Sequence, residues 1–202
     1  MLDKEILENR KRYLERASFY RSFGYDLEKE RDFILAKSLP VSGKILEIGT
    51  GKGHFALSLA KNGFNFVTID ISVEEQKFAR LNLRYFGLEK QAHFRIENAE
   101  RLSFADQSFD TIFSINVFHH LKNPLAVLNE IIRLLRPSGK TVLSDFSEKG
   151  LKIINGCHNR EGRTHDYFKN SLDQAKDYFF NKGFAVDEFQ SEIQRVVIAR
   201  YI

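Results

Sequence analysis

Three alternate glycines and one aspartate carry the clearest chemistry in the sequence. The segment LEIGTGKGHF leads from an apolar, strand-like run into a helix-like one, and its glycines are Gly49, Gly51 and Gly53. Asp70 closes the next apolar run, FNFVTID. A glycine turn lets the backbone pack close to a ligand, and a carboxylate after the second strand offers two acceptors to ribose hydroxyls. The spacing therefore predicts a nucleoside-binding site.

Histidines further along the chain are candidates for acid–base chemistry. His119 and His120 follow the apolar run FDTIFSI, and either ring suits a general base; helix entry and packing is the competing interpretation. A metal site would draw on Asp145, His158, His165 and Asp166. These residues lack the paired histidine spacing or the cysteine set typical of metal sites, so no metal is predicted.

Alternating strands and helices must position these residues. The predicted strands span residues 44–48, 64–69, 92–96, 110–115 and 140–146, and the predicted helices between them span 53–62, 73–86 and 123–136. Such alternation implies a parallel sheet covered on both faces. Two further helices, 3–18 and 27–38, are predicted ahead of it.

The carboxy-terminal part breaks this pattern. A helix predicted for 172–182 is followed by FAVDEFQ and IQRVVIAR, and two strands joined so closely pair as a hairpin. The last strand then enters the sheet antiparallel to its neighbour. The predicted fold class is α/β: a Rossmann-like, doubly wound sheet of seven strands, mostly parallel with an antiparallel carboxy-terminal hairpin strand, and with helices on both faces.

Length and composition predict one domain of a cytoplasmic protein. The 202 residues are 43% hydrophobic and 29% charged, no apolar run reaches membrane-spanning length, and the charged amino terminus lacks a signal-peptide core. Cys157 is the single cysteine, so a disulfide within the chain is impossible. The net charge of +4 is spread among interleaved acidic and basic residues, which does not favour nucleic acid as a partner.

Four ordered segments resemble the class I S-adenosylmethionine-dependent methyltransferases that act on small molecules. They are LEIGTGKGHF, VTIDIS, ENAERLSFADQSFDTIFSINVFHHL and LNEIIRLLRPSGK, and they cover roughly residues 44–146. The resemblance implies S-adenosylmethionine as cofactor, S-adenosylhomocysteine as product and a small-molecule methyl acceptor. The expected layout of this single domain is a helical cap (1–40), a cofactor-binding core (44–146), a variable acceptor-side insertion (147–171), and a closing helix and hairpin (172–202).

The glycine spacing agrees with this resemblance. Glu47 precedes the glycines in an E-x-G-x-G-x-G pattern, whereas dinucleotide-binding enzymes use G-x-G-x-x-G before a pyrophosphate. S-adenosylmethionine has no phosphate, and its sulfonium and ammonium charges need an acidic or carbonyl-rich wall. The resemblance assigns cofactor binding to Glu47, Gly49, Thr50, Gly51, Gly53, Asp70, Ile71, Asn98, Ala99 and Ser114.

Individual roles follow from the resemblance, and some have alternatives. Ile71 is expected against the adenine, the Asn98 carbonyl and the Ala99 backbone at its polar edge, and the Ser114 backbone at the methionine moiety. The glycines also suit an ordinary strand-to-helix turn, and Asp70 also suits a cap for a helix beginning near residue 72. Asn98 also suits a turn.

The acceptor side is expected after the fourth strand and in the insertion. Its candidates are Asn116, His119, Tyr20, Arg163 and His165, and the last two with Arg160 suit an anionic or polar acceptor. The insertion GLKIINGCHNREGRTHDYF is expected to form an acceptor-pocket wall or a solvated loop. An aromatic lid or ordinary packing is expected for Tyr13, Phe19, Tyr20, Phe23 and Tyr25.

Methyl transfer from a sulfonium is an in-line displacement, which needs a base only when the acceptor must lose a proton. Enzymes that methylate amino groups of nucleic-acid bases typically carry [DNS]-P-P-[YFW] where this chain has SINV, so base methylation is not favoured. The alternatives that stay open are methylation of RNA or protein, an NAD(P)-dependent oxidoreductase, and a non-catalytic S-adenosylmethionine-binding module.

Overall fold

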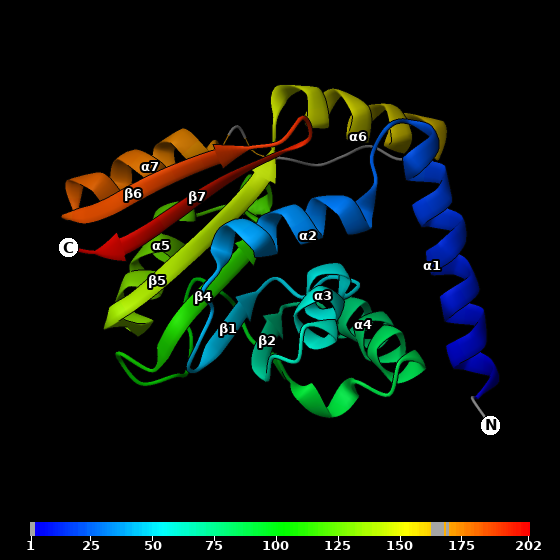
Figure 1. The fold of residues 1–202 in the computed structure, drawn as a ribbon, viewed down its shortest axis with the longest axis horizontal. Helices are drawn as coiled ribbons and strands as arrows, with labels where there is room; N and C mark the ends of the chain where they lie inside the picture. Colours follow the sequence, from blue (N-terminus) through cyan, green and yellow to red (C-terminus); the bar gives the residue numbers. More distant parts are fainter. Residues whose placement is uncertain (1–2, 163–167, 169) are drawn as a thin grey trace.

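A seven-stranded sheet in the order β3-β2-β1-β4-β5-β7-β6 forms the centre of the described chain (Figure 1). The structure is a computed structural model that describes residues 3–162, 168 and 170–202. The strands are β1 (Ile45–Ile48), β2 (Phe66–Asp70), β3 (Ala92–Ile96), β4 (Phe109–Ile115), β5 (Leu135–Phe146), β6 (Phe184–Gln190) and β7 (Gln194–Tyr201). The first five strands pair in parallel, and β7 is antiparallel to both β5 and β6. The predicted fold class and the predicted hairpin are confirmed.

Helices cover both faces of this sheet. They are α1 (Lys4–Ser22), α2 (Leu27–Ser38), α3 (His54–Lys61), α4 (Val73–Tyr85), α5 (Pro124–Leu134), α6 (Glu148–Arg160) and α7 (Leu172–Asn181), with short 3-10 turns at Glu89–Gln91 and Phe118–His120. Successive side chains of a strand point to opposite faces. In β4, Ile112 therefore packs in the core under α5 and α7, while Phe113 packs in the core under α2 and α3.

The helix α6 differs from the prediction, which left residues 147–171 as an insertion without helix. Ser147 caps α6 by accepting a hydrogen bond from the Gly150 backbone N–H at 3.0 Å. A Cβ on Gly150 would lie 2.2 Å from the Ile193 carbonyl oxygen, so glycine is required for this close packing. Gly150 and Gly156 lower the helix propensity of the segment and hid the helix in the sequence.

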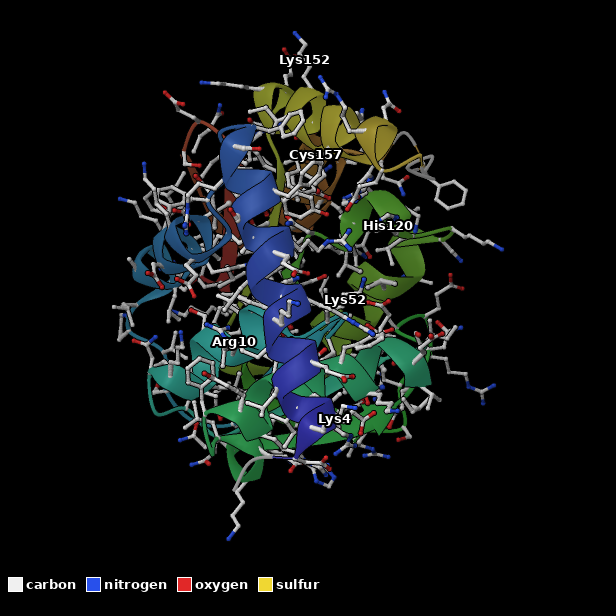
Figure 2. All side chains as sticks on the ribbon, turned by 90° about the vertical axis from the view of Figure 1, so that its right-hand side faces the viewer. Lys4, Arg10, Lys52, His120, Lys152 and Cys157 are labelled. Atoms are coloured by element: carbon white, nitrogen blue, oxygen red, sulfur yellow. The ribbon has the colours of Figure 1, made fainter. Side chains whose placement is uncertain are left out.

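The helix α1 crosses one side of the molecule and joins α4 to α6 (Figure 2). Its Asn9 Nδ2 donates to Asn82 Oδ1 of α4 at 2.9 Å. Towards its other end, Tyr20 packs with Ile154 and Cys157 of α6 in a small third core. Lys52 and His120 lie on the same side of α1 in Figure 2, so this helix borders the carboxyl ends of the sheet strands.

The predicted aromatic set of the amino-terminal region is largely packed. Tyr13, Tyr20 and Tyr25 are buried members of the third core, and Phe19 and Phe23 lie partly buried against it. Ordinary packing is therefore the role that the structure shows for most of these rings. Within the described ranges, no helix combines the length and the apolar character that a membrane crossing requires.

Candidate active site

The glycine turn between β1 and α3 borders a cavity of about 820 Å³ at the carboxyl ends of β1, β2 and β4. We call it the glycine-loop cavity. The predicted residues that line it are Glu47, Gly49, Thr50, Gly51, Asp70, Ile71, Asn98, Ala99, Asn116 and His120. Its volume falls within the range of about 300–1,000 Å³ found for small-molecule sites, and its position is where open α/β sheets bind ligands.

The glycines of the turn have two different tasks. Gly49 and Gly51 have φ angles of +86° and +48° and line the cavity, and a Cβ on Gly49 would lie 2.2 Å from Val117 Cγ2. Gly53, with φ of +78°, does not line the cavity, because its Cα faces α4, where a Cβ would lie 2.8 Å from Ala79 Cα. Gly53 therefore allows α3 to pack closely on α4, and its expected contact with the cofactor stays a prediction.

Asp70 ties the glycine turn to the start of α4. Its Oδ2 accepts from the Gly51 backbone N–H at 2.7 Å, and its Oδ1 accepts from the Ser72 N–H at 2.9 Å. Ser72 is the residue that caps α4, through a bond from the Glu75 N–H at 3.1 Å. Each carboxylate oxygen of Asp70 has a second lone pair, so the side chain retains acceptor capacity on the cavity wall.

Glu47 lies at the end of a buried chain of hydroxyls. Thr68 Oγ1 donates to Glu47 Oε2 at 2.6 Å, so the 2.6 Å contact between the Thr50 and Thr68 hydroxyls has Thr50 as donor. Gln76 Nε2 donates to Thr50 Oγ1 at 3.0 Å. Burial, with a smaller contribution from Asp70, outweighs the Thr68 hydrogen bond and raises the pKa of Glu47 to about 8.

Asn98 and Ile71 line one wall of the glycine-loop cavity. Asn98 Oδ1 accepts from the Glu100 backbone N–H at 2.9 Å, so the residue forms the turn that the sequence allowed, and it also lines the cavity beside Ala99. Ile71 lies on the same wall with 73% of its surface exposed, which leaves an apolar side chain open to a ligand.

The structure places Ser114 inside the sheet. Ser114 is buried inside β4, where it pairs with Ile48 of β1 and Leu143 of β5, and it does not line the cavity. Ile115 and Asn116 form that part of the wall instead. β4 ends at Ile115, where the sequence predicted, and the expected contact of the Ser114 backbone with the methionine moiety stays a prediction.

Arg31 of α2 is a site residue that the sequence analysis missed. It lines the glycine-loop cavity, is 7% exposed, and its Nε and Nη1 have no hydrogen-bond partner among the described residues. Unpaired N–H groups on a buried guanidinium are costly, so an anionic ligand would stabilise Arg31. In the sequence, Arg31 stands four residues after Leu27 and four residues before Leu35. It therefore shares a helix face with two apolar residues, and this spacing is the signal that could have found it.

A second cavity of about 230 Å³ lies beneath α1 and α6. We call it the histidine cavity. It shares Arg31, Lys52, His54, Glu75, Asn116 and His120 with the glycine-loop cavity, and adds Arg16, Tyr20, Tyr25, Leu27, His119, Phe146, Ile154 and His158. The two cavities are therefore neighbours at the end of β4.

Asn116 stands at this junction with a left-handed backbone. Its φ angle is +57°, its N–H donates to the Ser144 carbonyl at 2.7 Å, and its buried Oδ1 has no partner among the described residues. A non-glycine residue held in this conformation is uncommon and is typical of functional sites. Asn116 thus lies where a group in one cavity would face a group in the other.

His119 forms a buried pair with Asp145, the last residue but one of β5. Its Nδ1 lies 2.6 Å from Asp145 Oδ1, and its backbone N–H donates to Asp145 Oδ2 at 3.1 Å. A carboxylate at Nδ1 fixes the neutral tautomer with its proton on Nδ1, which makes Nε2 the proton-accepting nitrogen. The sequence analysis considered Asp145 only as a metal ligand. The neighbouring His120 ring, exposed and 4.0 Å from the His119 ring, lines both cavities.

Other acceptor-side predictions have mixed outcomes. Tyr20 lines the histidine cavity, and its hydroxyl accepts from Arg16 Nε and Nη2 at 2.9 and 2.7 Å. Arg163 and His165 lie outside the described residues, as does the Asp166 weighed for a metal. In the part of the chain that is described, no group of three histidine, cysteine or acidic side chains is arranged to hold a metal ion.

Comparison with known proteins bears on this arrangement. Residues 46–143 match the family described as a methyltransferase domain. The chain is 34% identical over 108 residues to the methyltransferase GfsG of Streptomyces halstedii, covering 53% of this chain and 39% of that protein. It is 33% identical over 120 residues to the ubiquinone biosynthesis O-methyltransferase of Xanthomonas oryzae pv. oryzae, and the match covers 57% of this chain and 48% of that protein. The chain thus spans less than half the length of these relatives.

The fold has solved counterparts as well. A SAM-dependent methyltransferase structure from Methanosarcina mazei matches with a TM-score of 0.63 and 22% identity, covering 84% of this chain and 97% of that one. At this identity the match shows the fold alone. The domain match and the relatives show that residues 46–143 are similar to methyltransferase domains, as the sequence resemblance implied.

Proposed function

We propose that this chain transfers a methyl group from S-adenosylmethionine to a small-molecule acceptor. The observation that carries the proposal is the pair of buried ionisable side chains, the acidic Glu47 and the cationic Arg31, on the wall of the glycine-loop cavity. The methionine part of the cofactor is a zwitterion, so a guanidinium for its carboxylate and an acidic group for its cationic side fit it together. A dinucleotide pyrophosphate would place negative charge close to Glu47.

The rest of the glycine-loop cavity suits the adenosine part. We assign the ribose hydroxyls to Asp70, whose carboxylate is already oriented by two backbone N–H groups. We assign the faces and edge of the adenine to Ile71, Asn98 and Ala99, which line the same wall. An exposed isoleucine gains apolar contact when a ring covers it.

Bound S-adenosylmethionine supplies a methyl group on a sulfonium, whose C–S electron pair stays on sulfur as the acceptor lone pair bonds to the methyl carbon. The chain's own residues hold the two reactants in adjoining cavities at Asn116 and exclude water under α1 and α6. Where the acceptor must lose a proton, His119 Nε2 takes it, and Asp145 holds the ring and balances the resulting imidazolium.

The acceptor class, domain layout and location are also proposals. Three matched relatives are named ubiquinone biosynthesis O-methyltransferase, 27-O-demethylrifamycin SV methyltransferase and 2-methyl-6-phytyl-1,4-hydroquinone methyltransferase, which supports a small-molecule acceptor. Ile154 and His158 of α6 line the histidine cavity, which supports residues 147–171 as an acceptor-side wall, within one domain that α1 and α2 cap. The lone cysteine favours the cytoplasm.

Labelled methyl transfer into a small-molecule cell extract tests this function. With S-adenosylmethionine carrying a labelled methyl, we expect mass spectrometry to find label on a small molecule. His119→Asn should lower kcat by about 100-fold or more, as expected for loss of a general base. Asp145→Asn should also lower kcat and shift its pH profile, which a purely structural role would not do.

The control is His93→Asn, which changes an exposed histidine on β3 away from both cavities. It should leave kcat unchanged, and all three variants should bind S-adenosylhomocysteine within about twofold of the natural chain. Cofactor binding without label on any small molecule would contradict catalysis and favour a non-catalytic module. Label found only on RNA or protein would contradict the small-molecule acceptor.

A further inference from the structure

The histidine cavity has an excess of positive charge. Among its described lining residues, Arg16, Arg31 and Lys52 are cations, and Glu75 is the carboxylate that opposes them. Glu75 lies 3.9 Å from Lys52, while Arg16 lies 3.6 Å from Glu161 outside the lining. Arg31 has no such acidic neighbour within 4 Å in the described chain.

The pKa of His54, which lines the same cavity, reflects this positive charge. Burial is the largest cause that lowers the pKa of His54, to about 3, and the charges of Arg31, Arg16 and Lys52 add to it. Three cations from α1, α2 and the glycine loop therefore act on one point between the cavities. The cofactor does not offset them, because its sulfonium and ammonium outweigh its carboxylate by one positive charge.

Two buried side chains in this cavity carry hydrogen-bond donors that have no partner among the described residues. Tyr25 is 1% exposed and its hydroxyl makes no hydrogen bond, although its ring is held by stacking on Tyr20 at 5.8 Å and an edge contact with Phe146 at 5.7 Å. Arg31 contributes Nε and Nη1. Native proteins rarely bury such groups unpaired, so each points to a ligand atom. The five N–H groups of Arg31, which lines both cavities, suffice for two carboxylates.

We propose that the methyl acceptor is a small carboxylic acid, bound as its carboxylate between the Tyr25 hydroxyl and the Arg31 guanidinium. The inference rests on the proposed methyl transfer and names its substrate class. Two donors match the two oxygens of a carboxylate, and the cation excess offsets its charge beside the sulfonium. The size of the cavity limits the acceptor to a small molecule or the end of a longer one.

The first experiment fractionates the small-molecule extract on an anion exchanger at neutral pH before the reaction. Each fraction is then incubated with labelled S-adenosylmethionine and the protein. The proposal predicts label in the retained, anionic fraction. Label confined to the unretained fraction would overturn it while leaving methyl transfer intact. Label in neither fraction would contradict the proposed function itself, and this inference with it.

The second experiment uses Tyr25→Phe, which removes only the hydroxyl. We expect the KM for the retained acceptor to rise at least tenfold, with the Kd of S-adenosylhomocysteine within twofold. Because the hydroxyl has no partner among the described residues, the melting temperature should stay equal or rise. Tyr178→Phe, in which the lost hydroxyl bonds Asn129 far from the cavity, is the matched control and should leave KM unchanged. An unchanged KM in Tyr25→Phe would overturn the carboxylate site.

Discussion

Glu47 lines the site, and its protonation state depends on the charge of the bound ligand. The carboxyl is buried, is held by the Thr68 hydroxyl, and has a pKa raised to about 8. A cation beside it favours the ionised form. Near neutral pH, the binding of a cationic ligand must therefore release a proton from Glu47.

This linkage gives a signed pH dependence. Below pH 8 the proton on Glu47 opposes S-adenosylmethionine binding, so affinity should rise with pH by up to about tenfold per unit and level off above pH 8. Titration calorimetry in buffers of different ionisation enthalpy should detect net proton release near pH 7. Glu47→Gln, which cannot ionise, is the control that accounts for the ligand's own titration. Equal proton release by both forms would contradict the assignment.

At the residue level, the sequence predicts what a local motif fixes. The E-x-G-x-G-x-G turn and Asp70 identify themselves because their spacing places backbone and carboxylate at one strand end. Arg31 and Tyr25 carry no such motif. Their role depends on how α2 packs against the sheet, which brings them to a cavity that distant segments form.

At the level of elements, the order of strands and helices was predictable from the sequence, whereas the packing between the glycine turn and α4 was not. The strand and helix order was predictable from apolar periodicity, since each β–α unit has a clear apolar run. The close approach of Gly53 to Ala79 was not, because it depends on the angle at which α3 crosses α4. The helix α6 was missed for a related reason, since its Gly150 serves tertiary packing at Ile193.

A pair of glycine substitutions tests this close approach. Gly53 and Gly63 have similar φ angles of +78° and +81°, but a Cβ on Gly63 meets nothing within 4 Å. Gly63→Ala should cost about 1–2 kcal/mol from the left-handed backbone alone. Gly53→Ala adds the clash with the Ala79 backbone, and its melting temperature should fall by at least about 2–4 °C more. Equal losses in the two variants would show that α4 yields freely at this contact.

At the scale of the whole molecule, the site depends on where chain segments meet. The parallel strands β1, β2 and β4 end at one edge and supply Glu47, Asp70 and Asn116. The helices α1 and α6 lie beside that edge (Figure 1). Arg16 of α1, Arg31 of α2, Lys52 of the glycine turn, Tyr25 of the α1–α2 connection and Ile154 of α6 line the histidine cavity there. The sequence motifs therefore identify the cofactor half, and the helical cover determines the acceptor half.

The most direct measurement of the central claim is a calorimetric titration of the protein with S-adenosylmethionine, S-adenosylhomocysteine, NAD and NADP. The account predicts saturable binding of the first two at one site per chain and no heat above dilution from either dinucleotide. Arg31→Met should weaken the first two by about tenfold or more, because it removes a charged hydrogen bond to the methionine carboxylate. Binding of a dinucleotide without binding of S-adenosylmethionine would contradict the account.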